Sequence, residues 1–170
     1  MRLLVLSLLL AAGPVLAQDG PRYDADGFAK CIADAETDAG AGPGLPGCIG
    51  QASRQCMATP GGETTVGMVD CLGHEAKDWD KLLNGYYERA LKTAEAADAE
   101  LAELGSAAIP AAPALQQAQR HWIAFRDSSC RYEGLRYQGG TLGGPAAQDC
   151  VLRLTAEQAL RLRDIAEGIE

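Results

Sequence analysis

Apolar residues recur every three or four positions through most of this 170-residue chain, while alternating, β-branched stretches are almost absent. This spacing places side chains on one face of an α-helix, so the pattern predicts an all-α fold. Clusters rich in glycine and proline, which favour turns, interrupt the pattern at residues 40–47, 59–62, 105–113 and 134–145. About five helices are therefore expected between these breaks.

The third helical segment has the longest apolar stripe, with side chains from Val69 to Leu104 at alternating spacings of three and four. We expect one long central helix there, with Thr64 or Thr65 as its N-cap and Gly85 as the place for a bend. The whole pattern is typical of a small helical bundle built around one long helix.

The other helices are expected over residues 24–39, over residues 46–58, from Pro113 to about Tyr137, and from Pro145 to the C-terminus. Within the last segment, residues 155–158 have the sequence Thr-Ala-Glu-Gln, which has the form of a capping box. A capping box marks the start of a helix, so the sequence predicts that a helix restarts at Thr155.

Residues 1–17 have the order of a secretory signal peptide: Arg2, an apolar run over 3–12, and small residues before a cleavage point after Ala17. The run is shorter than the roughly 18 residues that a membrane-spanning helix needs. The residue directly after the cleavage point is Gln18 and not a cysteine, so a lipid anchor is not indicated. We therefore expect a periplasmic or secreted product without a membrane anchor.

All six cysteines follow this leader, and an even number of cysteines in an exported chain predicts disulfides. The sequence alone does not fix their connectivity. Successive antiparallel helices bring sequence neighbours together, and a metal or redox site is less favoured because no C-x-x-C pair occurs. The favoured pairs are Cys31 with Cys48, Cys56 with Cys71, and Cys130 with Cys150. Their expected effect is to stabilise a bundle whose first helices are short.

The chain is acidic, with 23 Asp and Glu against 15 Lys and Arg and a net charge of -8. Removal of residues 1–17 takes away one arginine and no acid, so 14 basic and 23 acidic residues give -9. This charge disfavours nucleic acid and anionic membranes and favours a basic protein partner. The simpler alternative is that the acids only keep the domain soluble.

No set of residues with a spacing typical of catalysis stands out. His74 and Glu75 resemble half of an H-E-x-x-H zinc site, but Asp78 takes the place of the second histidine. His121 lies between Arg120 and Trp122 and is expected to be a polar surface residue. We therefore predict a protein that is not an enzyme and has neither a metal nor another cofactor.

Two ordered motifs are similar to those of the LprI-type lysozyme-inhibitor-like domain. The first motif begins at residues 64–71 and continues with Glu75, Trp79, Asp80, Leu83, Asn84, Tyr86 and Tyr87. The second comprises residues 118–120, Trp122, Ile123, Phe125, Arg126, Asp127, Cys130, the turn Gly139-Gly140-Thr141, Cys150, Leu154 and Thr155. The resemblance covers residues 64–162, so we expect an LprI-like domain over 64–170 and a cysteine-containing helical extension over 18–63.

The resemblance implies an exported, non-enzymatic helical domain whose founding member inhibits lysozyme. That founding member is a lipoprotein, whereas this chain lacks the cysteine that would carry the lipid. The family motif residues are expected to be structural. Trp79, Leu83, Tyr86, Trp122 and Phe125 lie on apolar stripes and are expected in the core, with Asp80, Asn84, Arg126 and Asp127 as buried hydrogen-bonding partners. The alternative function is a periplasmic structural or protein-interaction module that does not act on lysozyme.

The loop over residues 133–144 is the expected partner-binding element, because a Cys130 to Cys150 bridge would hold its two ends. Its candidate contact residues are Glu133, Arg136, Tyr137, Gly139, Gly140 and Thr141. This loop holds one acid and one base, so its charge suits a basic lysozyme poorly. The acid-rich stretch 95–103 is therefore a second candidate.

Overall fold

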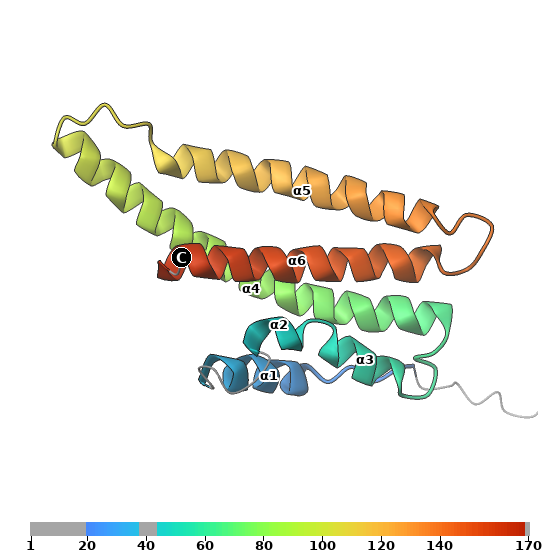
Figure 1. Cartoon of the computed structure of the whole chain (residues 1–170). Coiled ribbons are helices and arrows are strands. Elements are labelled where there is room, and N and C mark those ends of the chain that lie inside the picture. Colours follow the sequence, from blue (N-terminus) through green and yellow to red (C-terminus); the bar gives the residue numbers. More distant parts are fainter. Residues whose placement is uncertain (1–19, 38–43, 169–170) are drawn as a thin grey trace, which may run out of the picture.

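The computed structural model describes residues 20–37 and 44–168, which form six helices (Figure 1). These helices are α1 (Ala25–Thr37), α2 (Gly44–Cys48), α3 (Gln51–Met57), α4 (Thr65–Glu103), α5 (Ala111–Leu135) and α6 (Gly143–Glu167). This described part contains no strand, so the predicted all-α class is confirmed. The signal peptide expected over residues 1–17 lies outside the described residues.

The long helix α4 organises the bundle. Figure 1 shows α6 alongside α4, with α5 on one side of this pair and the short helices α1, α2 and α3 on the other. The contact between α4 and α6 is the most extensive in the molecule, and α5 packs more on α6 than on α4. The fold is therefore a central helix pair covered on its two sides.

The core lies where α4 meets α6. Trp79 and Leu83 of α4 and Leu152 and Leu162 of α6 are all at most 2 % exposed. Between these large side chains, α6 presents alanines that let the two helices approach closely. The N-terminal helices add Phe28, Ile32, Leu45 and Ala52 to the same cluster of buried residues.

The helix α4 runs unbroken for 39 residues, about 58 Å at 1.5 Å per residue. Thr64 is its N-cap, and the Gly67 amide donates a 3.0 Å hydrogen bond to the Thr64 hydroxyl, which confirms one of the two predicted caps. Figure 1 shows that the second half of α4 curves away from the first. The helix remains continuous through Gly85.

Two expected helix boundaries are wrong. The helix predicted over residues 46–58 is divided into α2 and α3, because Gly50 adopts a left-handed conformation with φ of 77°. The helix start predicted at Thr155 does not exist, since α6 continues through this residue, which is 1 % exposed. Packing of this stretch into the core keeps the helix continuous where the local capping pattern favours a start.

Three disulfides tie neighbouring helices together. The bonded pairs are Cys31 with Cys48, Cys56 with Cys71, and Cys130 with Cys150. These are the sequence neighbours that antiparallel helices favour. The separations of 17, 15 and 20 residues correspond in the chain-entropy model to about 3 kcal/mol for each bridge.

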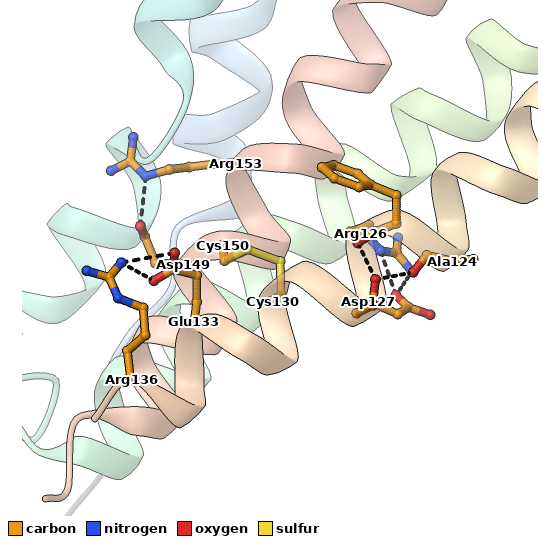
Figure 2. Close-up of a disulfide and its surroundings, with 11 residues drawn as sticks. Ala124, Arg126, Asp127, Cys130, Glu133, Arg136, Asp149, Cys150 and Arg153 are labelled. Atoms are coloured by element: carbon orange, nitrogen blue, oxygen red, sulfur yellow. Dashed lines mark hydrogen bonds and ion pairs between the residues drawn. A yellow bond between two sulfur atoms is a disulfide. The ribbon is translucent and has the colours of Figure 1, made fainter. Parts of the chain in front are cut away.

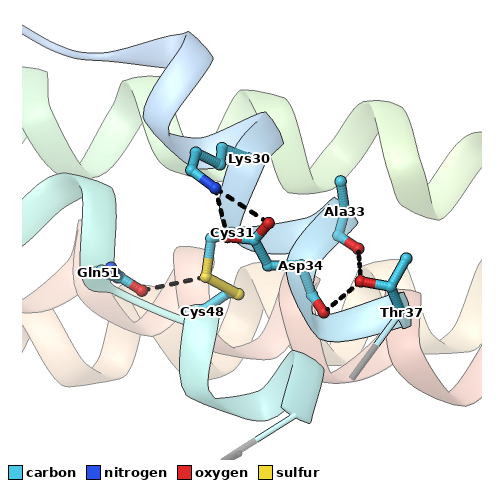
Figure 3. A network of polar contacts seen from close by, with 7 residues as sticks. All are labelled: Lys30, Cys31, Ala33, Asp34, Thr37, Cys48 and Gln51. Atoms are coloured by element: carbon cyan, nitrogen blue, oxygen red, sulfur yellow. Dashed lines mark hydrogen bonds and ion pairs between the residues drawn. A yellow bond between two sulfur atoms is a disulfide. The ribbon is translucent and has the colours of Figure 1, made fainter. Parts of the chain in front are cut away.

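The first disulfide connects α1 to the end of α2 (Figure 3). Gln51 Oε1 lies 3.0 Å from Cys31 Sγ, and because this sulfur belongs to the disulfide, it has no thiol proton to donate. On the same helix, Lys30 pairs with Asp34 at 2.8 Å on the exposed surface. This exposed pair lies within α1 and adds little to stability. The disulfide is therefore the main link between α1 and α2.

A buried carboxylate joins α4 to the start of α3. Glu75 is 0 % exposed, and its two oxygens accept hydrogen bonds of 2.6 Å from the backbone amides of Gly50 and Ser53. The Trp79 indole N–H donates to the same carboxylate at 3.2 Å. The edge of Phe28 from α1 meets Trp79 with ring centroids 5.4 Å apart. Glu75 therefore links α1, α3 and α4.

Replacement of Glu75 by glutamine should destabilise the protein by roughly 2–4 kcal/mol, because an amide retains one acceptor oxygen for three buried donors. Urea unfolding of the oxidised protein, followed by circular dichroism, measures this loss. Glu88→Gln is the matched control, since Glu88 is exposed on the same helix, and it should change stability by less than about 0.5 kcal/mol. Equal stability of Glu75→Gln and the wild type would contradict this role.

Candidate functional site

A groove of about 840 Å³ lies between the end of α5 and the start of α6. One wall comes from α5 and from Tyr137 just beyond it, and carries aromatic rings and hydroxyls; the other comes from α6, and half of its lining residues are charged. The lining residues are Phe125, Ser128, Ser129, Tyr132, Glu133, Tyr137, Ala146, Asp149, Cys150, Arg153, Leu154 and Glu157. The Cys130–Cys150 disulfide joins the two walls, as Figure 2 shows.

Two ion pairs nearly neutralise this groove. Glu133 pairs with Arg136 at 2.9 Å, and Asp149 pairs with Arg153 at 2.8 Å; both pairs lie on the same side of the disulfide in Figure 2. Hydrogen bonding to the neighbouring carboxylate raises the pKa of Arg136 and of Arg153. Both guanidinium groups therefore stay charged, and the groove offers fixed donors and acceptors with little net charge.

Only part of the predicted contact loop lines this groove. Glu133 and Tyr137 line it, whereas Arg136 does not line it but pairs with Glu133. Gly139, Gly140 and Thr141 are exposed in the turn between α5 and α6 and do not line the groove.

Most of the aromatic and apolar motif residues are buried as expected, but Phe125 is not. Trp79, Leu83 and Tyr86 are at most 5 % exposed, and Trp122 packs partly buried against the core. Phe125 is 57 % exposed, so its expected place in the core is wrong. It lies on the α5 face that lines the groove, and the sequence spacing does not reveal which apolar stripe faces inward.

The polar motif residues bond within their own helices. Asn84 donates to Asp80 at 3.1 Å, and Arg126 donates to Asp127 at 2.9 Å, both at the exposed surface. The expectation that they are buried partners is therefore wrong. Asp80 and Arg126 instead border one shallow hollow of about 390 Å³ between α4, α5 and α6. Arg126 also lies over the ring of Trp122, 5.1 Å from its centroid.

A second notable surface is the tip of the hairpin formed by α4 and α5, which we call the hairpin tip and define as residues 101–110. Every residue in it is exposed, including Leu104 at 83 % and Ile109 at 88 %. Both side chains lie largely in water, so a partner that covered them would gain the free energy of their burial.

The hairpin tip has a defined conformation. Gly105 adopts a left-handed conformation with φ of 68°, and the Ser106 amide donates back to the Leu101 carbonyl at 2.9 Å. The Ala108 amide donates to the Ser106 hydroxyl at 3.1 Å. Together these bonds end α4 and turn the chain towards α5.

Asp98 of α4 caps the N-terminus of α5. Its two carboxylate oxygens accept hydrogen bonds from the amides of Ala111 and Ala112 at 2.7 and 2.8 Å. Pro110 precedes α5 and has no side-chain group that could do this. The local sequence around Pro110 does not reveal this contact, because the capping group lies on the preceding helix. Asp98 therefore closes the base of the hairpin tip.

The surroundings of the hairpin tip are acidic. The stretch between Lys92 and Arg120 contains four acids and no Lys or Arg. The acids are Glu95, Asp98, Glu100 and Glu103. We call these four acids the acidic stem of the hairpin tip. The apolar tip and its acidic stem contrast with the nearly neutral groove at the opposite end of α5.

Both histidines contact neighbouring side chains. His74 stacks on Tyr23 with ring centroids 5.2 Å apart, and the Tyr23 hydroxyl donates to Asp78 at 2.9 Å. Burial and the hydrogen bond to Asp78 raise the pKa of Tyr23, so this phenol stays protonated. His121 contacts the Gln117 side chain at 2.7 Å on the surface of α5.

Two further properties concern the described residues alone. Within residues 20–37 and 44–168, no three His, Cys, Asp or Glu side chains are grouped to hold a metal ion. None of the helices in this part has the length and apolarity needed to span a bilayer.

These features define a disulfide-linked helical domain with two exposed surfaces suited to binding. Comparison with known proteins shows that residues 56–162 match the family described as lysozyme inhibitor LprI, and the chain belongs to this family.

Two similar proteins come from bacteria. An uncharacterized protein of Rhizobium meliloti (strain 1021) is 30% identical over 100 residues, which cover 59% of this chain and 72% of that protein. An uncharacterized 17.7 kDa protein from the puhA 5' region of Rhodobacter capsulatus is 28% identical over 177 residues, covering 99% of both chains. No solved structure shows a significant match.

Replacement of Asp98 by alanine should fray the first turn of α5 and cost about 1–2 kcal/mol, because two amides lose their acceptor. Amide exchange of Ala111 and Ala112, measured by NMR, should become faster. Glu95→Ala is the matched control on the same helix and should leave these amides protected. Unchanged exchange in Asp98→Ala would show that the cap does not hold the hairpin tip.

Proposed function

We propose that this chain is an exported, non-enzymatic binding protein that inhibits a lysozyme. Its membership of the LprI family supports this proposal most directly. The three disulfides and the family both favour a location outside the cytoplasm. The alternative remains a periplasmic interaction module that has no effect on lysozyme.

The hairpin tip is the element that fits this function best. Lysozymes are typically basic proteins whose two catalytic carboxylates lie in a groove. An acidic side chain placed in that groove would be repelled by these carboxylates, whereas an apolar side chain would not. Leu104 and Ile109 are the most exposed apolar residues of the hairpin tip. In our proposal they enter the groove while the acids of the stem face its basic rim.

The defined conformation of the hairpin tip favours strong binding. A loop held by the Asp98 cap and by the bond from Ser106 to Leu101 loses little conformational freedom in a complex. Burial of one large apolar side chain contributes roughly 1.5–3 kcal/mol. Leu104 and Ile109 together can therefore account for a large share of the binding energy.

The acidic stem argues against two other partners for the hairpin tip. A second copy of this chain would bring two acidic stems together, and an anionic membrane surface would repel the stem in the same way. A basic protein is attracted over a longer range, and salt weakens this attraction.

A lysozyme inhibition assay tests this proposal. The wild-type protein should form a stoichiometric complex with a basic lysozyme and block lysis, and this effect should weaken as salt rises from about 0.05 to 0.5 M. A double variant, Leu104→Ser with Ile109→Ser, should lose at least about tenfold in inhibition.

Val66→Ser is the matched control, because Val66 is 73 % exposed on α4 far from the hairpin tip. It should inhibit as well as the wild type. If the wild type neither binds nor inhibits any basic lysozyme at low salt, the proposal fails and the interaction module is the better description.

A further inference from the structure

We propose that the groove between α5 and α6 binds a saccharide chain with no net charge. This site is separate from the hairpin tip, and the inference does not depend on the action on lysozyme. It rests on three properties of the groove: its exposed aromatic rings, its paired charges and its rigid walls.

The aromatic side of the groove is the first argument. Phe125, Tyr132 and Tyr137 line it and are 57 %, 65 % and 43 % exposed. Phe125 and Tyr132 are seven residues apart on one face of α5, a rise of about 10 Å, which is close to the length of two linked sugar rings. Sugar rings have apolar C–H faces that pack on aromatic rings, while Tyr hydroxyls remain free for hydrogen bonds.

The polar side of the groove is the second argument. Ser128 and Ser129 provide hydroxyls, and Asp149, Arg153 and Glu157 provide charged donors and acceptors. A sugar hydroxyl both donates and accepts, so it can bond to either member of an ion pair. Glu133 and Asp149 are each paired with an arginine, and among the charged lining residues only Glu157 lies outside these two pairs, so the groove carries little net charge. A polar ligand without net charge suits such a surface best.

The rigidity of the groove is the third argument. The Cys130–Cys150 disulfide joins the two walls (Figure 2), and each wall is part of a long helix or follows it directly. A site that is already ordered loses less entropy when it binds. Its volume of about 840 Å³ lies within the roughly 300–1,000 Å³ of small-ligand sites.

Exposed Tyr, Phe and Arg also occur in protein interfaces, so a protein partner is the competing occupant. For a basic protein the groove offers little attraction, because Glu157 is its one lining charge outside the two ion pairs. The observations therefore favour the saccharide, and the experiment below separates the two.

The test is a titration of the full oxidised chain with chitotetraose and with cellotetraose, two uncharged probes, by calorimetry and by NMR. Binding should be measurable at millimolar or lower concentration, with shifted resonances from the lining residues. Phe125→Ala and Tyr132→Ala should each weaken binding at least tenfold. Ile123→Ala is the matched control, because Ile123 is 41 % exposed on the same helix and does not line the groove.

The inference is overturned if the wild type binds neither probe or if both aromatic variants bind as the wild type does. It is also overturned if Phe125→Ala weakens a lysozyme complex while no saccharide binds, since the groove would then be a protein contact. Failure of the lysozyme proposal can be told apart from failure of this inference. In that case the wild type would still bind the saccharide, and Phe125→Ala would still weaken this binding.

Discussion

The fold depends on the buried carboxylate of Glu75. The helices α1, α2 and α3 contain 13, 5 and 7 residues, and helices of this length are marginal alone in water. Glu75 accepts the free amides at the start of α3 and orients Trp79, on which α1 packs. The Cys56–Cys71 disulfide lies about one helical turn before it on α4. Both contacts act on the same part of α4, so they attach the N-terminal helices to the central pair as one unit.

The two halves of α4 differ in burial. The first half of α4 is buried on several sides, whereas beyond Ala90 nearly every residue is at least partly exposed. The exposed half carries the hairpin tip and holds α5 through Asp98. At the opposite end of α5, the Cys130–Cys150 disulfide joins the two walls of the groove. One acidic apolar surface and one nearly neutral aromatic surface therefore lie at the two ends of one helix.

The apolar spacing was enough to predict α4 and α5 and to favour disulfides between neighbouring helices, because these features follow from local periodicity. The break at Gly50 depends on a left-handed backbone conformation, and the continuity of α6 at Thr155 depends on burial against α4. The exposure of Phe125 and the Asp98 cap depend on the neighbours of each helix in space. For this reason the fold class could be predicted from the sequence, whereas the two proposed binding surfaces could be found only in the structure.

The central claim is that the hairpin tip is the surface that contacts lysozyme. Hydrogen–deuterium exchange of the oxidised chain, with and without a basic lysozyme at low salt, tests it most directly. Our account predicts new protection concentrated over residues 101–112, with the groove residues around Tyr132 unchanged. Protection confined to the groove, or to α1 and α3, would contradict the account even if lysozyme were inhibited.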